Sequence, residues 1–250
     1  MLNRQYKLLF LCALLVFLSK AQVNSDIRRT YHWYFGNKAG VDFTSGMPTA
    51  DTLNQMKAAE GCAVISDTCG NLLFYTNGDT VWDRNHMVMP TGTGLISGFS
   101  STQRALIVPK PQSSTIFYIF TTTHVGQASI GFYYHVVDMS LNSGFGDVIT
   151  KNTLLFSPTT EKLAATYHSN GQDIWVIGRK LNLPDFYSYL ITASGIITTP
   201  VVTSIGAVVP NGGDGYMRFS YDGNKIAAAH HSGGAGYVDT TDIYDFDKTT

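Results

Sequence analysis

The sequence predicts an all-β protein made of repeated antiparallel strands. Aromatic residues make up 12% of the 250 residues and the chain contains 24 glycines. This composition suits short strands joined by tight turns. Apolar runs recur in pairs around glycine-containing turns, whereas helical periodicity is confined to Thr52–Ala59, where one short helix is expected.

Three segments share one local pattern of apolar strand, polar turn and second apolar strand. They are Ala63–Asn77, Ala164–Gly178 and Met217–His231. A glycine in each turn supplies the positive φ that a tight hairpin needs: Gly70, Gly171 and Gly223. A fourth hairpin, Arg104–Thr123, has a longer connection that contains Pro111.

A third strand is expected after each hairpin, and Phe132–Met139, Tyr187–Thr192 and Asp242–Asp247 occupy that position. A weaker fourth strand follows in two copies, around Asp147–Asn152 and Ile196–Val202. Four-stranded antiparallel units that recur about every 45–57 residues have the spacing of propeller blades. The sequence therefore predicts a β-propeller of four-stranded antiparallel blades.

The number of units predicts an incomplete ring. Between Trp33 and Thr250 there is room for about four to five blades of an expected seven. A propeller must close to remove its sheet edges, so residues 22–250 are interpreted as a partial β-propeller domain. A closed five-bladed ring is the alternative, and it would have to borrow Trp33–Phe35 as its closing strand.

The N-terminus predicts export. Met1–Lys7 carries two basic residues and no acidic one, Leu8–Leu18 is apolar but too short to span a bilayer, and Ala21 ends a cleavage motif. Residues 1–21 are therefore expected to be a signal peptide. Cys12 lies inside the apolar run and follows Leu11, which argues against a lipoprotein, and no later stretch predicts a transmembrane segment.

Charge and cysteine content exclude some partners. With 14% charged residues and a net charge of −1, the chain has nothing to attract nucleic acid. After signal removal Cys62 and Cys69 remain, and both are expected to be free. Cys69 lies at a turn tip and Cys62 about 15 Å back along the strand, farther apart than a disulfide allows.

Several blocks resemble one protein family. They include WYFGNKAGVDF (Trp33–Phe43), GNLLFYTNGDTVWDRNH (Gly70–His86), STQRALIVPKP (Ser101–Pro111) and GFYYHVVDM (Gly131–Met139). In order they are similar to the N-terminal propeller-like region of large secreted Bacteroidetes surface proteins, which usually end in a gliding-motility-associated or type IX secretion sorting domain. The resemblance implies a cell-surface or extracellular location reached through the periplasm, and a multidomain parent. It carries over no catalytic residues.

The candidate chemical motifs are weak. Gly92–Gly98 resembles a nucleotide-binding glycine loop, but a β-stretch follows it, so a loop between strands is the preferred interpretation. No serine has the spacing of a nucleophile elbow. A Ser-His-Asp set can be assembled from scattered residues, but seven histidines make such a set expected by chance, so it is rejected as a catalytic site.

The histidine, acidic and tryptophan residues offer further candidate sites. His230 and His231 are adjacent on a strand, so they point to opposite faces and cannot share a metal. The acidic run Asp239, Asp242, Asp245 and Asp247 offers a glycosidase-like carboxylate pair but is better explained as a solvated strand edge. Trp175 is expected in the core, whereas Trp33 and Trp82 are possible stacking platforms for sugars.

These observations predict an exported binding or adhesion module of the cell surface, with an extracellular protein or carbohydrate as its partner. No catalytic residue can be named, and no cofactor or metal is expected. The alternative is a propeller hydrolase or lyase that acts on extracellular polysaccharide, which would require acids or a histidine from different blades to converge.

Overall fold

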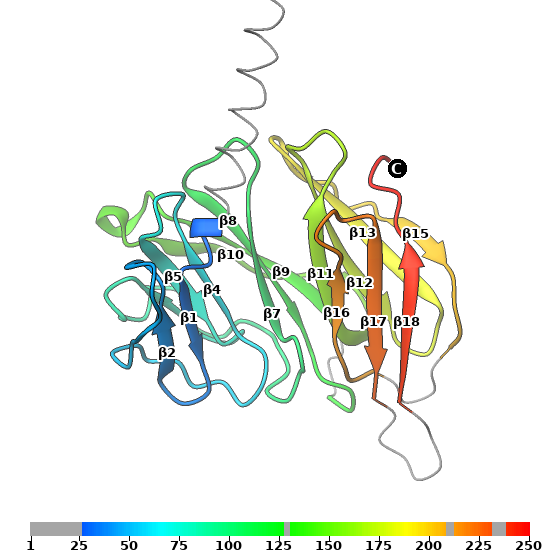
Figure 1. Cartoon of the computed structure of the whole chain (residues 1–250), viewed down its shortest axis with the longest axis horizontal. Coiled ribbons are helices and arrows are strands. Elements are labelled where there is room, and N and C mark those ends of the chain that lie inside the picture. The colour runs from blue at the N-terminus through cyan, green and yellow to red at the C-terminus, as the bar shows by residue number, and fades with distance from the viewer. Residues whose placement is uncertain (1–26, 128–130, 209–212, 232–238) are drawn as a thin grey trace, which may run out of the picture.

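The structure is a computed structural model that describes residues 27–127, 131–208, 213–231 and 239–250. The described chain forms five antiparallel sheets that follow one another along the sequence (Figure 1). The all-β prediction is confirmed. The predicted signal peptide, residues 1–21, lies outside the described residues.

The strands are assigned to the sheets as follows. The first sheet contains β1 (His32–Phe35), β2 (Ala39–Asp42) and β3 (Thr49–Ala50), and the second contains β4 (Ala63–Ser66), β5 (Leu72–Thr76) and β6 (Val81–Asp83). The third contains β7 (Ala105–Pro109), β8 (Ile116–Thr122), β9 (Phe132–Asp138) and β10 (Asp147–Phe156). The fourth contains β11 (Thr159–Tyr167), β12 (Ile174–Lys180), β13 (Asp185–Thr192), β14 (Gly195–Ile196) and β15 (Val201–Ser204). The fifth contains β16 (Met217–Phe219), β17 (Lys225–His230) and β18 (Thr240–Asp245), and a 3₁₀ turn, η1 (Asn142–Gly144), separates β9 from β10.

All four predicted hairpins are present. They are β4–β5, β7–β8, β11–β12 and β16–β17, each paired antiparallel. The turn glycines have the expected positive φ, 97° at Gly70, 69° at Gly171 and 71° at Gly223. Only glycine adopts such angles without a steric cost, so these residues fix the positions of the turns.

Sheet size varies more than the sequence predicted. The third sheet has four strands, the fourth has five, and the others have three. In the fourth sheet the predicted last strand, Ile196–Val202, is divided around Pro200, and both β14 and β15 pair with β13. Proline has no N–H to donate to a ladder, so the pairing is interrupted there.

The short helix predicted at Thr52–Ala59 is wrong. Burial in this segment alternates, with Asn54, Met56 and Ala58 buried and Leu53 and Lys57 exposed. The chain is extended and hydrogen-bonded to the first sheet, because the Lys38 N–H donates to the Met56 carbonyl and the Ala58 N–H donates to the Gly36 carbonyl. Tertiary packing therefore overrides the local helical pattern.

Consecutive sheets pack face to face around four apolar clusters. One strand can serve two of them: in β8, Phe117 and Ile119 lie in the cluster between the second and third sheets, whereas Tyr118 and Phe120 lie in the cluster between the third and fourth. Because alternate residues of a strand face opposite sides, burial on both faces requires a continuous apolar run. This explains the unbroken IFYIF sequence of β8.

The first strands of the sheets are neighbours in order. β1 contacts β4, β4 contacts β7, β7 contacts β11, and β11 contacts β16. Gln103, just before β7, joins three sheets: its Nε2 donates to the carbonyls of Leu163 and Met217 at 2.9 and 3.2 Å, and its Oε1 accepts from their N–H groups.

The first and fifth sheets lie at opposite ends of the molecule (Figure 1). β1 pairs with β2 in a sheet of its own, so the alternative in which Trp33–Phe35 completes the last sheet is wrong. Each end sheet leaves one face uncovered: Trp33 and Phe35 are 52% and 46% exposed in the first sheet, and Ile243 is 69% exposed in the fifth. Among the described residues, no helix is long and apolar enough to cross a membrane.

Candidate functional site

The glycine loop Gly92–Gly98 is a packed connection between β6 and β7. A Cβ at Gly92 would meet the Val81 carbonyl at 2.8 Å, and one at Gly98 would meet the His124 nitrogen at 2.1 Å. Asn152 and Lys151 of β10 donate to carbonyls of the same loop. Gly92 and Gly98 serve close packing, and the segment runs between two strands, so the interpretation as a loop between strands is confirmed.

The two adjacent histidines point to opposite faces, as expected. His230 is 3% exposed and faces the fourth sheet, whereas His231 is exposed and its Nδ1 lies 3.1 Å from Asp239. Among the described residues, no group of three or more His, Cys, Asp or Glu side chains is arranged to hold a metal.

The acidic run is divided among separate interactions. Asp242 contacts His230 and Tyr244, and Asp245 pairs with Lys225. Asp247 lies beyond β18 and accepts hydrogen bonds from Thr249. Each carboxylate therefore has its own local partner, as expected for a strand edge.

The three tryptophans differ in exposure. Trp82 is 8% exposed and stacks on Tyr75, with ring centroids 5.3 Å apart, so it is a core residue and no sugar platform. Trp175 is 4% exposed and its Nε1 donates to the Lys248 carbonyl, which confirms the core prediction. Trp33 is half exposed and packs against Phe43.

One Ser-His-Asp series is brought together. The Ser66 Oγ lies 2.9 Å from His32 Nδ1, and His32 Nε2 lies 3.8 Å from Asp42 Oδ1. Ser66 is fully buried, and both Asp42 oxygens already accept hydrogen bonds from Thr44. A buried hydroxyl cannot reach a substrate, so this series fixes the first sheet against the second and has no geometry for catalysis.

Among the described residues, a cleft with a volume of about 390 Å³ lies between the second and third sheets. It is lined by the β4–β5 turn, by the β7–β8 loop and by Arg29, which precedes β1. The apolar residues of its floor are Leu73 and Phe117. The polar lining residues are Arg29, Asp67, Thr68, Gln112, Ser113 and Ser114.

The turn between β11 and β12 is joined to both neighbouring sheets. Gln112 Nε2 donates to Gln172 Oε1 at 3.1 Å, which connects the third sheet to the fourth. The Ser169 N–H donates to the Lys248 carbonyl at 3.2 Å, which connects the fourth sheet to the fifth. The cleft is therefore the place where two neighbouring turns leave a space between them.

Electrostatics in the cleft favour binding over proton transfer. Burial would raise the pKa of Asp67, but hydrogen bonds from Asn71 and Cys69 outweigh it and hold that pKa below its ordinary value. Asp67 is then an ionised acceptor in a cleft that Arg29 also lines. A general acid needs a pKa near the working pH, and the lowered pKa of the Asp67 carboxyl group does not meet this requirement.

A second polar cluster surrounds Glu161 at the start of β11. Its carboxylate accepts hydrogen bonds from the Thr102 N–H and hydroxyl and from the Val125 N–H. Burial raises the pKa of Glu161, the hydrogen bonds oppose this, and nearby Asp214 adds to it. Glu161 is 2% exposed, so its role is to fix the loops of the third and fourth sheets.

Sequence reasoning missed both polar sites. The cleft residues lie in turns whose positions were predicted, but nothing in the sequence shows which turns lie apart. The signal for the second cluster was the TTEK run Thr159–Lys162, a polar stretch of β11 whose four residues are all buried. Buried charges of this kind require partners, which predicts a network.

Comparison with known proteins gives distant likeness to solved structures alone. No family model matches the chain, and no curated protein matches it. Among solved structures, a triple arginine-to-alanine mutant of AofleA from Arthrobotrys oligospora matches with 11% identity and a TM-score of 0.42, covering 86% of this chain and 68% of that chain. A likeness this distant says nothing about ligand or activity.

Proposed function

We propose that this chain is part of an incomplete β-propeller that works as a binding module. The support is the order of contacts, in which the first strand of each sheet neighbours the first strand of the next. Four apolar clusters separate the five sheets in sequence, and the two end sheets each leave an apolar face open. Further blades would cover these faces and remove the open ends.

We place ligand binding in the cleft between the second and third sheets. Its lining combines a cation, a carboxylate, hydroxyl groups and an amide above an apolar floor. A few converging polar groups beside apolar surface are typical of small-molecule sites. The opposite charges of Arg29 and Asp67 leave no net charge, so a neutral carbohydrate, with many hydroxyl groups and apolar C–H faces, fits better than a charged ligand.

The proposed cellular setting is extracellular. The N-terminal residues have the pattern of a signal peptide, and the sequence resembles the exported surface proteins described above. The chain would then reach the cell surface through the periplasm as one part of a larger adhesive protein.

The alternative is a polysaccharide hydrolase or lyase. Its support is the Glu161–Asp214 pair, in which one carboxyl group has a raised pKa. Against it stands the burial of Glu161 and its three hydrogen bonds to the loops, which leave no path for a substrate.

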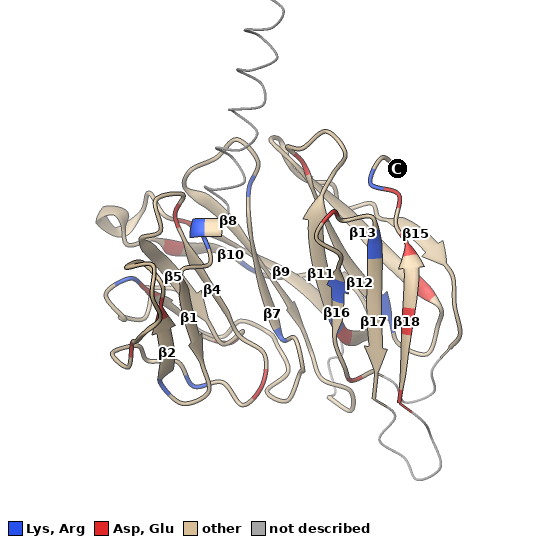
Figure 2. Cartoon of the chain, viewed as in Figure 1, with Lys and Arg blue, Asp and Glu red and all other residues tan. Residues whose placement is uncertain are grey.

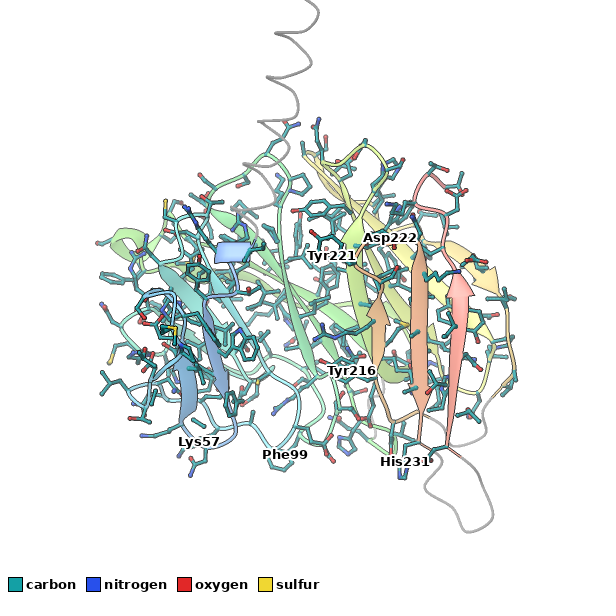
Figure 3. All side chains as sticks on the ribbon, viewed as in Figure 1. Lys57, Phe99, Tyr216, Tyr221, Asp222 and His231 are labelled. Atoms are coloured by element: carbon teal, nitrogen blue, oxygen red, sulfur yellow. The ribbon has the colours of Figure 1, made fainter. Side chains whose placement is uncertain are left out.

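A cleft-filling substitution tests the proposal. Thr68 and Tyr221 occupy equivalent positions in two hairpin turns, two residues before Gly70 and Gly223. Tyr221 is 96% exposed and lies at the far end of the fifth sheet from His231 (Figure 3). Thr68→Trp would occupy the cleft, whereas Tyr221→Trp introduces the same residue at a turn outside it.

The measurement is calorimetric titration with neutral oligosaccharides selected from a glycan array. We expect Thr68→Trp to weaken binding at least tenfold and Tyr221→Trp to leave it unchanged. Equal affinity of both variants would show that the cleft is the wrong site. A chain that binds no neutral glycan, or that releases new reducing ends from one, would contradict the proposed function.

A further inference from the structure

His230 lies at the end of β17, where the fifth sheet packs on the fourth. Its Nε2 is 2.9 Å from the Arg179 guanidinium and 3.2 Å from a carboxylate oxygen of Asp242. Arg179 is on β12 and is 2% exposed, and Asp242 is on β18. The imidazole therefore lies between a buried cation and a carboxylate, inside the joint between two sheets.

Arg179 and Asp242 require opposite protonation states of His230 Nε2. Arg179 can only donate, so it requires a neutral imidazole whose Nε2 accepts. Asp242 can only accept, so it is satisfied when Nε2 carries a proton. The Asp242 oxygen concerned already accepts from the Tyr244 hydroxyl at 2.7 Å. The other ring nitrogen, Nδ1, is buried and has no hydrogen-bond partner among the described residues.

We propose that His230 is an acid-sensitive latch: its protonation opens the joint between the fourth and fifth sheets, and the fifth sheet detaches while the rest of the chain stays folded. A protonated imidazole would donate to Asp242 and lose the bond from Arg179. Two adjacent cations would then share one carboxylate inside the joint, because the Arg179 guanidinium also lies 3.9 Å from Asp242. The fifth sheet has one face open to solvent and packs its apolar face on the fourth. Gln103, which bonds Met217 of β16, joins it to the third sheet. β17 and β18 can therefore open locally.

The groups that face His230 favour its neutral form in the closed joint. Burial, together with the charges of Lys162 and Arg179, lowers the pKa of His230 to about 4, and Asp242 acts in the opposite direction. Lys162 comes from β11 and is fully buried, with its amino group donating to the Gly213 carbonyl. The charges that face His230 thus come from three strands, β11, β12 and β18.

The direction and size of the effect follow from these values. An opened fifth sheet has an ordinary histidine with a pKa of 6.5, so it binds a proton more readily than the closed form does. Opening is therefore favoured as the pH falls from 6.5 towards about 4 and is unaffected above 6.5. Between pH 7.5 and 5.0 the population of the open form should rise about 30-fold.

His135 provides the internal contrast. It is fully buried in the third sheet, but both nitrogens are satisfied: Nε2 donates to Thr121 Oγ1 at 3.0 Å, and Nδ1 accepts from the Asn152 N–H at 3.0 Å. Burial and the charge of Lys151 lower its pKa to about 3. Its sheet is covered on both faces, so it has no local way to open.

Hydrogen exchange of the whole chain at pH 7.5 and 5.0, corrected for intrinsic rates, tests the proposal. The opening of β17 and β18 should rise about 30-fold in the wild type and in His231→Gln, whose change is on the adjacent exposed histidine. In His230→Gln the rise should vanish. A rise of equal size in His230→Gln would overturn the proposal, and so would exchange of β8 and β9 that rises together with, and at the same rate as, exchange of β17 and β18.

A measurement without a variant covers the case in which His230→Gln does not fold. The imidazole proton resonances of the wild type are followed by NMR during acidification. The proposal expects the His230 signal of the closed form to remain neutral at pH 5.5 while a second, open form appears. Titration of His230 near pH 6.5, with no second form, would show that the joint has no latch.

Discussion

The joint between the third and fourth sheets and the joint between the fourth and fifth sheets are built differently. The former is an apolar cluster whose large fully buried side chains include Phe120, Phe132 and Tyr189. The latter has a smaller apolar cluster and, beside it, the buried Arg179, Lys162 and His230. Figure 2 shows basic and acidic positions on β17 and β18. The same strand arrangement thus supports one joint held by burial and one held partly by charge.

The largest effect is expected from the apolar joint. Phe120→Ala removes a fully buried ring and should lower the free energy of unfolding by about 3–5 kcal/mol. The loss should be the same at pH 7.5 and 5.5, because nothing that Phe120 contacts in this cluster titrates between these values. Urea denaturation at both pH values measures it. Leu53→Ala, at a position 75% exposed, is the control and should change little.

A smaller effect is expected where the two joints meet. Gln103 bonds the backbones of Leu163 and Met217, so Gln103→Ala leaves backbone groups of the fourth and fifth sheets without partners. The expected cost is about 1–3 kcal/mol. Gln103→Met keeps the size of the side chain but not its polar atoms. If Gln103→Met were as stable as the wild type, packing rather than hydrogen bonding would hold this position.

The smallest effect is expected on the outer face of the fifth sheet. Lys225 and Asp245 form an ion pair at 2.5 Å, but their side chains are 59% and 89% exposed. Water and salt screen such a pair, so Asp245→Asn should leave the midpoint of thermal unfolding unchanged within error. A clear loss of stability would mean that charge matters on both faces of this sheet and would weaken the contrast between the joints.

The strands were predictable because burial on both faces requires long apolar runs, as in β8, and because Gly70, Gly171 and Gly223 mark the turns. The extended segment around Met56 was not predictable, because its pattern of four apolar positions also fits a helix. The polar partners of His230 and Glu161 could not be predicted from the sequence for another reason. They come from strands far apart in the sequence, and only the packing of one sheet on the next brings them together.

The alternation of side chains in β8 makes its alignment unusually strict. An insertion of one residue within Ile116–Thr122 would send Phe117 and Ile119 to the side now filled by Tyr118 and Phe120, and the reverse. Both neighbouring sheets would then meet side chains of the wrong shape at once. A register shift in β8 therefore disrupts the packing on both of its faces. The alignment of this one strand thus determines how the second and fourth sheets pack against the third.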